Sequence, residues 1–448
     1  MTRRTPPMQS LRRAISETSG TNLLGMLLQL TSGIIAARVL GPEGRGQLAA
    51  MQLWPSCLVT FGSLGLMTAT AYYCGREPSS SGRILGTAWF VLATLSIPLM
   101  ALGYWLMPVL LKSQNSDVIR TARFLLLLIP VQFSGNLPFN ALQGMGRFRI
   151  WNLIRPQFTV LWIGVLLAAL WFRHRDASFV ALGYLVAMSI HCATWIVSMF
   201  CCIPGPYRPE PPLVRPLLQY GLPAVASGVP QQLNLRLDQL LMAAFLPPRL
   251  LGLYAVAVAA SGAISPVLAA VSQVMFARLA GLSSVVEQGA AAARALRLSA
   301  LAGAGLIAGL SVAMPVFLPL AFGSAFRPAI PAALVLTVAS GIASLNLIAG
   351  ECIRGMGLPR LPLIAESLGL VFTFVLLALL LKPYQLMGAA VASLVSYAVV
   401  FATYLWLLNR RTNIPFRMFL FARGAEIRDL LRGVLAGPTR VVAKGQEA

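Results

Sequence analysis

The sequence has few charged residues, and acidic ones are the scarcest. Only 11% of its 448 residues are charged, with 13 Asp and Glu in total, whereas ordinary soluble domains carry roughly a quarter. There are two His, and the six Cys have no paired C-x-x-C spacing, so the pattern indicates neither a zinc site nor a disulfide framework. This composition excludes an ordinary soluble enzyme.

Long apolar runs take the place of the missing charges. Apolar residues make up 57% of the chain and the mean hydropathy is +0.76; about 20 such residues cross a bilayer as a helix. The sequence predicts an all-α, polytopic membrane protein of about twelve spans. The first is read as a retained span rather than a signal peptide, because its apolar stretch is long and eleven more follow. The predicted spans are 21–39, 48–73, 84–111, 122–143, 156–172, 178–202, 216–246, 251–277, 297–322, 328–351, 361–381 and 387–408.

The formal net charge of +22 comes from basic residues in the short gaps between these runs. Of the 35 Lys and Arg, 24 fall in segments on the side of the two termini and 10 on the opposite side. Basic loops stay in the cytoplasm, so we expect both termini to be cytoplasmic. No basic patch interleaved with aromatics appears, and we expect no nucleic-acid partner.

Two short motifs recur at nearly the same offset. Residues 40–49 match residues 246–255 at an offset of 206, and residues 142–149 match residues 353–360 at an offset of 211. Taken singly, each match is explained equally well as ordinary turn residues. Together they predict a duplicated six-span unit, whose even number of crossings makes a parallel repeat about an axis along the membrane normal. The expected organisation is a lobe at 1–206, a lobe at 207–409 and a basic amphipathic cytoplasmic tail at 410–448, with a disordered tail as the alternative.

The residues that carry a resemblance are Ala37 to Gly46, the Asp238-Gln239-Leu240-Leu241 stretch that runs into Leu251-Gly252-Leu253-Tyr254, and the paired Gly-Met-Gly sites. Over roughly 15–410 the chain resembles the polysaccharide biosynthesis (O-antigen type) flippase family of the multidrug/oligosaccharidyl-lipid/polysaccharide exporter superfamily. The resemblance implies a twelve-helix transporter that moves a polyprenyl-pyrophosphate-linked oligosaccharide from the cytoplasmic to the periplasmic leaflet. It implies a lipid-linked oligosaccharide and membrane lipids as partners, and no catalysis or cofactor. A polysaccharide polymerase or glycosyltransferases are further candidate partners.

The polar residues of the seventh predicted span form the sharpest candidate site. An ionisable residue inside a span is costly and marks a pathway by default. Arg236 is a candidate anchor for pyrophosphate, because a guanidinium matches phosphate oxygens and stays charged; a structural ion pair with Glu366 is the alternative. On a continuous helix Asn234 and Asp238 share a face and Arg236 points away. Asp238 is a candidate ion-coupling residue, with a packing role as the alternative.

The remaining candidates are spread along the chain. Glu366, inside the eleventh span, is a second candidate for ion coupling. In the first lobe Gln29, Asn136 and Asn140 supply hydrogen-bonding groups for sugar hydroxyls, with ordinary interhelical hydrogen bonds as the alternative. His191 is read as a structural histidine.

Three other functions were weighed against flipping. A cation-coupled small-molecule exporter of the same superfamily is the main alternative, although it calls for more buried carboxylates. A membrane-embedded glycosyltransferase is disfavoured by the short external loops. An assembly scaffold for a polysaccharide synthesis complex stays open.

Overall fold

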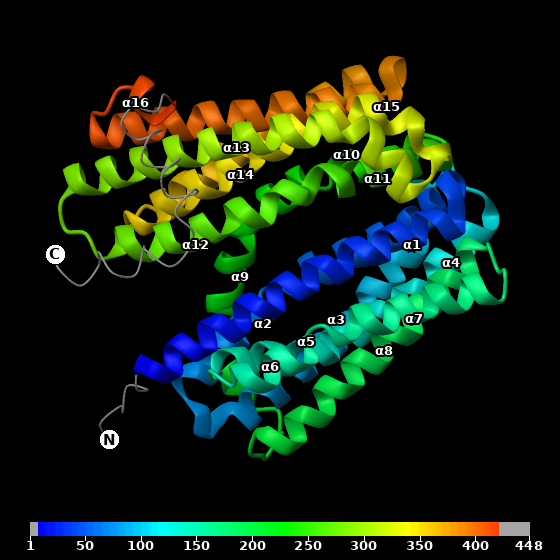
Figure 1. Ribbon diagram of the computed structural model, residues 1–448. Helices are drawn as coiled ribbons and strands as arrows, with labels where there is room; N and C mark the ends of the chain where they lie inside the picture. Colours follow the sequence, from blue (N-terminus) through cyan, green and yellow to red (C-terminus); the bar gives the residue numbers. More distant parts are fainter. Residues whose placement is uncertain (1–7, 421–448) are drawn as a thin grey trace. The chain divides into compact units, whose positions relative to one another are not determined.

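The computed structural model describes residues 8–420, and within them the chain is helical, without a β-strand (Figure 1). The first half contains α1 (Met8–Gly62), α2 (Leu66–Arg76), α3 (Ser81–Leu110), α4 (Ser116–Phe124), α5 (Leu128–Gly144), α6 (Phe148–Ile154), α7 (Gln157–Trp171) and α8 (Ala177–Cys202). The second half contains α9 (Pro211–Asn234), α10 (Leu237–Phe245), α11 (Pro248–Ser261), α12 (Ser265–Ala280), α13 (Val285–Phe322), α14 (Ile330–Gly355), α15 (Arg360–Thr412) and α16 (Arg417–Leu420). Short 3₁₀ turns are η1 (Pro78–Ser80), η2 (Leu125–Leu127), η3 (Gly262–Ile264) and η4 (Ser324–Ala329).

Within residues 8–420, eight helical stretches are long and apolar enough to cross a membrane, and nine if the bent pair Pro248–Ile264 and Leu268–Ala280 is one span. Two of the eight contain a break in the backbone, at Gly41 in α1 and at Gln385 in α15. At 1.5 Å per residue, α1 and α15 are each about 80 Å long, far more than a hydrocarbon core of about 30 Å, so each makes two crossings. With α9 and α10 as the remaining span, these stretches match the twelve expected crossings.

The described chain divides into two compact units that do not follow the sequence halves. Unit 1 comprises residues 1–260, 314–333 and 373–392, and unit 2 comprises 261–313, 334–372 and 393–448. Unit 1 therefore contains α1 to α10 and nearly all of α11, together with the end of α13, the start of α14 and the middle of α15 around its break at Gln385. The predicted lobes at 1–206 and 207–409 stay a prediction.

Unit 1 is built on α5, which packs against α2, α3 and α8, while α1 packs along α7 and α8 (Figure 1). Close approach depends on glycine. A Cβ on Gly144 of α5 would lie 1.9 Å from the carbonyl oxygen of Ala71 on α2, so a side chain there is excluded by the backbone of the neighbouring helix.

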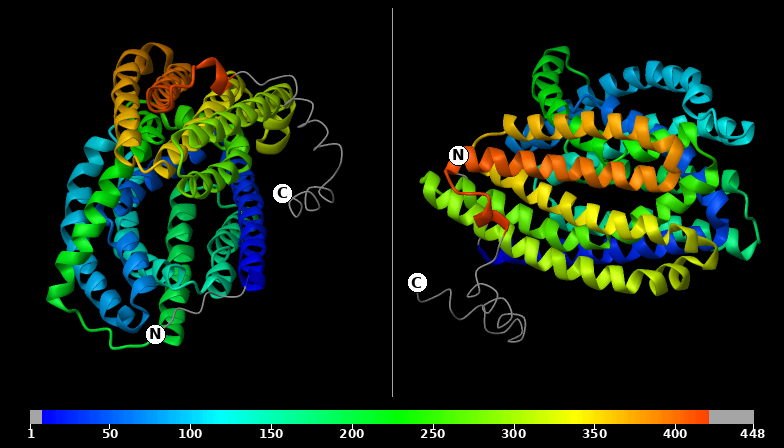
Figure 2. Two further views of the ribbon diagram at one scale, coloured as in Figure 1. Left: turned by 90° about the vertical axis from the view of Figure 1, so that its left-hand side faces the viewer. Right: turned by 90° about the horizontal axis from the view of Figure 1, so that it is seen from above.

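Unit 2 is built on the parts of α12, α13, α14 and α15 that share one apolar core, and α13, α14 and α15 run side by side in both views (Figures 1 and 2). Phe419, at the start of the predicted tail, is fully buried in this core, and Arg297 donates to the carbonyl of Met418. The beginning of the tail is thus docked on helices; residues 421–448 lie outside the described residues.

The second sequence repeat has the same local structure in both copies. Gly146 and Gly357 both adopt a left-handed backbone, at φ 72° and 79°, which favours glycine at the end of a helix. After α5, Arg147 N–H donates to Leu142 O at 2.9 Å, and after α14 Leu358 N–H donates to Ile353 O at 3.2 Å. The two helix ends are therefore the same motif at the same offset, as the predicted duplication requires.

Candidate functional site

The seventh span is broken at its polar cluster. α9 ends at Asn234 and α10 begins at Leu237, with Arg236 at the N-cap position in a non-helical conformation. The continuous helix expected over 216–246 is therefore wrong. Pro223 and Pro230 each remove a backbone donor from α9, which weakens the helix leading into the break.

The break buries Asn234 and Asp238 and leaves Arg236 exposed. Asn234 and Asp238 are each 3% exposed, although they no longer lie on one continuous helix. Thr373 of α15 donates a hydrogen bond to Asn234 Oδ1. Tyr254, fully buried on α11, donates to one carboxylate oxygen of Asp238, and the other accepts from Gln239 N–H at 2.7 Å. Both side chains therefore connect helices of unit 1, and no ion or sugar is needed to satisfy these atoms.

Arg236 has a different environment. Within the described part of unit 1 its side chain has no hydrogen-bond or ion-pair partner, and it lies within electrostatic range of Cys57 on α1 and Tyr184 on α8. Both neighbours belong to the first half of the chain. The guanidinium thus faces first-half helices across the broken span, with its donors free to bind an anion.

Three buried donors on α1 lack hydrogen-bond partners among the described residues: Arg45 Nε, Gln52 Nε2 and Trp54 Nε1. Arg45 and Gln52 are seven residues apart, which places them on one face of the helix. Buried donors are nearly always satisfied, so such groups mark where a polar ligand or water is expected. Nothing in the sequence distinguishes these residues from the other polar residues of the spans.

The predicted sugar-binding residues of the first half are accessible in different degrees. Gln29 is exposed on α1, while Asn136 and Asn140 are half-buried on α5. The amide nitrogen of Asn140 donates to Asn136 O at 2.7 Å, which leaves the Asn140 carbonyl oxygen free. The structure does not bring Gln29 into contact with these two asparagines through any hydrogen bond among the described residues.

His191 is held in a chain of polar side chains between α7 and α8. Trp195 Nε1–H donates to His191 Nε2 at 3.0 Å, His191 Nδ1 meets Gln157 Oε1 at 3.3 Å, and Gln157 Nε2 donates to Thr194 Oγ1 at 3.0 Å. Nε2 accepts, so the proton is on Nδ1. The ring is neutral and both its nitrogens are used, which makes this histidine structural, as predicted.

Glu366 lies in unit 2 and is 5% exposed. Tyr404, on the second stretch of α15, donates to Glu366 Oε1 at 3.0 Å. Glu351 of α14 pairs with Arg354 one turn further on. Glu366 is thus a buried, hydrogen-bonded carboxylate inside a membrane span.

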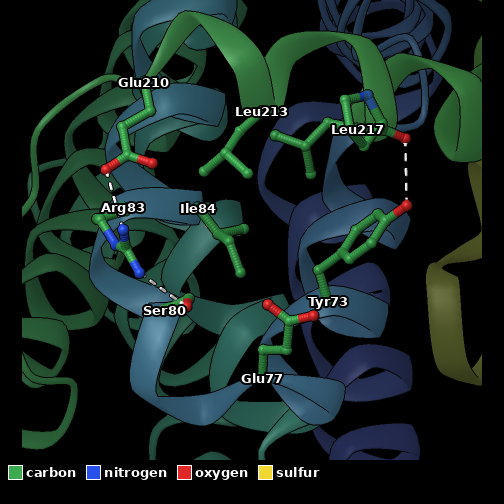
Figure 3. Close-up of a pocket in the computed structure, with 9 residues that line it drawn as sticks. Tyr73, Glu77, Ser80, Arg83, Ile84, Glu210, Leu213 and Leu217 are labelled. Carbon is green, nitrogen blue, oxygen red and sulfur yellow. Dashed lines mark hydrogen bonds and ion pairs between the residues drawn. The ribbon is translucent and has the colours of Figure 1, made fainter.

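The segment that joins the two halves is fixed to the first. Residues 203–210 lie over the first turns of α3: Glu210 N–H donates to Thr87 Oγ1 at 2.9 Å, and Arg83 pairs with Glu210 at 3.2 Å. Figure 3 shows Arg83 between Glu210 and Ser80 at the edge of a cavity of about 280 Å³. The cavity is lined by Tyr73, Glu77, Ser80, Arg83, Ile84, Glu210, Leu213, Pro216 and Leu217.

These contacts hold the joining segment against α3 as far as Glu210. Arg83, the arginine that lines the cavity, is already paired with Glu210, so the cavity holds the joining segment in place and we do not assign it to transport.

Residues 11–283 match the model of the polysaccharide biosynthesis protein family. The chain is a polytopic helical membrane protein, and it belongs to this family. Comparison with curated proteins gives no match to an individual protein.

Solved structures show the same fold at low sequence identity. The chain is similar to the lipid II flippase MurJ in an inward closed conformation, with a TM-score of 0.74 and 15% identity over 93% of this chain and 96% of that one. It is similar to a multidrug resistance MATE family transporter of the MOP superfamily in an inward-facing conformation, with a TM-score of 0.68 and 16% identity over 89% and 99%. A MOP superfamily transporter from Pyrococcus furiosus gives a TM-score of 0.57 and 15% identity over 89% and 95%.

Proposed function

We propose that this protein flips a polyprenyl-pyrophosphate-linked oligosaccharide from the cytoplasmic to the periplasmic leaflet of a bacterial inner membrane, by alternating access, for surface polysaccharide synthesis. The observation that carries the proposal is the guanidinium of Arg236, which lies at the break of a transmembrane helix and has no partner within the described part of unit 1. Broken helices at mid-membrane are where transporters of several folds bind polar substrates. Family membership and the similarity to a lipid II flippase support the same class of substrate.

The physical difficulty of the reaction is the pyrophosphate. Burying an unpaired anion in a low-dielectric medium costs many kcal/mol. A fixed guanidinium lowers that cost, and so does the N-terminus of α10, whose dipole favours negative charge. Gln52, closer to Cys57 on α1, supplies a further donor without a partner among the described residues, while the polyprenyl tail stays in lipid.

The direction of transport follows from charge. With an inside-negative potential, moving an anion outward gains about 2.3 kcal/mol per charge per 100 mV. The excess of basic residues in the segments on the side of the termini favours both termini in the cytoplasm. No catalytic residue or cofactor is assigned.

The first-half amides are proposed to bind sugar hydroxyls. Asn136 and Asn140 share one face of α5 and retain carbonyl oxygens for a ligand. Gln29 is accessible on α1. Asn234 contributes less to the proposal, since its side-chain oxygen already accepts from Thr373.

A cation-coupled small-molecule exporter is the second candidate, favoured by the similarity to MATE family transporters. Asp238 and Glu366 are the proposed coupling residues in either case, because each is a buried carboxylate that a proton or Na⁺ would neutralise.

The test uses the purified full chain in liposomes that contain an undecaprenyl-pyrophosphate-linked oligosaccharide. We expect the lipid to reach an external glycosidase faster than in protein-free liposomes. An absence of acceleration, combined with energised efflux of a cationic dye, would replace the flippase by the exporter.

A further inference from the structure

The first sequence repeat forms a reciprocal contact within unit 1. A Cβ on Gly46 would lie 1.7 Å from the carbonyl oxygen of Pro248, and a Cβ on Gly252 would lie 1.8 Å from the carbonyl oxygen of Pro42. The offset of 206 that relates the two motifs converts the first contact into the second. A contact that maps onto itself is produced by a local two-fold axis, so the duplicated motifs meet at the pseudo-two-fold.

The contact has no room for side chains. Each of these distances is far below van der Waals separation, and the obstructing atoms are backbone. The first turns of the stretch after Gly41 in α1 and of α11 therefore touch through their main chains. Only glycine at both positions permits this approach.

Around the glycines, donors of the first half bind carbonyls of the second. Gln114, 7% exposed, donates its amide to Ala243 O at 3.1 Å, and Ser113 Oγ donates to Ala244 O at 2.8 Å. Arg38 Nε donates to Ala321 O at 2.7 Å. All three acceptors lie in the last turns of α10 and α13, where helix carbonyls lack intrahelical partners.

We infer that this cluster is the outward gate of the transporter, with Gly46 and Gly252 as the positioning residues that set its closed state. On the predicted topology the loops after the first, third, seventh and ninth spans are periplasmic, and the cluster is made from them. The inference rests on the proposed alternating access. In the structure described here the gate is closed.

The chemistry of the cluster suits reversible opening. When α1 and α11 separate, the carbonyls at the ends of α10 and α13 are exposed to water. Water then replaces Gln114, Ser113 and Arg38 as the hydrogen-bond donor. Net hydrogen-bond energies are small when water is the alternative partner. The glycine contact, by contrast, exists only in the closed state, so a methyl group there acts on the closed state alone.

The chain carries a reporter for this gate. Cys57 is 6% exposed on α1, eleven residues after Gly46, or about 16 Å deeper along the helix. In a variant that keeps Cys57 and replaces the other five cysteines, a membrane-impermeant maleimide added to the periplasmic face labels Cys57 only when the gate opens. Labelling is measured without lipid-linked substrate.

We expect Gly46→Ala and Gly252→Ala each to raise the rate of outside labelling at least about tenfold. Gly33→Ala is the matched control, because Gly33 lies on the stretch of α1 before Gly41 with nothing within 4 Å of its Cβ position, and its rate should not change. Gln114→Ala removes a donor without adding bulk and should give a smaller increase in the labelling rate. It still tests the gate if Gly46→Ala and Gly252→Ala do not fold.

The inference would be overturned if the folded glycine variants label Cys57 no faster than Gly33→Ala. It would also be overturned if labelling is accelerated only from the cytoplasmic face, or if the labelling rate of Gln114→Ala is unchanged. Faster outside labelling in a protein that flips no lipid-linked oligosaccharide would support the gate and refute the proposed substrate.

Discussion

Replacement of Arg236 is the most direct test of the substrate proposal. In Arg236→Ala the pyrophosphate loses a charge-assisted, two-donor contact of a kind that contributes about 1.5–3 kcal/mol. At 1.4 kcal/mol per factor of ten, flipping should slow by about 10- to 100-fold. Since the side chain has no partner within the described part of unit 1, its loss leaves no buried carboxylate exposed there, and the fold should be unaffected.

Arg236→Lys separates charge from geometry. Lysine keeps the positive charge but lacks the planar fork that binds two phosphate oxygens. We expect an intermediate rate, about three- to tenfold below the unmodified protein. Arg120→Ala is the control: its side chain is 72% exposed, with Asp117 as an ion-pair partner at 3.8 Å, and such surface pairs contribute little.

The assay is exposure of undecaprenyl-linked oligosaccharide to an external glycosidase in liposomes with equal amounts of each variant. An Arg236→Ala protein that flips within about twofold of the Arg120→Ala control would refute the assignment of Arg236 to the substrate path.

Three further outcomes follow from buried contacts. Tyr254→Phe removes the hydroxyl that donates to Asp238, so thermal unfolding of the detergent-solubilised protein should show a loss of about 1–3 kcal/mol; unchanged stability would mean that the carboxylate is satisfied without it. Gly144→Ala should cost at least about 1–3 kcal/mol by overpacking, whereas Gly164→Ala, with nothing within 4 Å, should cost nothing, and equal effects would contradict the close packing. Glu366→Gln should keep the fold and make flipping insensitive to an imposed pH gradient; retained sensitivity would assign coupling elsewhere.

The class of protein was determined by composition and periodicity. Twelve apolar runs of bilayer length allow only a helical membrane protein, since backbone groups in lipid must be satisfied within the helix. The duplication was also readable, because left-handed glycines such as Gly146 and Gly357 are required by a helix end and therefore leave a mark in the sequence.

Features that depend on long-range contacts could not be predicted from the sequence. The seventh span reads as one helix, although the chain breaks at Arg236, and nothing local shows that Asp238 is held by Tyr254 or Asn234 by Thr373. In the sequence, a polar residue that faces another side chain cannot be distinguished from one that faces a substrate. Its partner, sixteen residues away for Asp238 and 139 away for Asn234, is chosen by packing.

By itself, then, the sequence determined the number of crossings, the duplication and the scarcity of intramembrane charge, because each follows from local hydrophobicity and backbone conformation. Only the tertiary structure decided which of the polar groups remain free. It left Arg236 without a partner in unit 1, and it brought Gly46 and Gly252 to the same point from opposite halves of the chain. The reason is that hydrogen bonds and close contacts between distant segments depend on which helices are neighbours, and local sequence does not encode that choice.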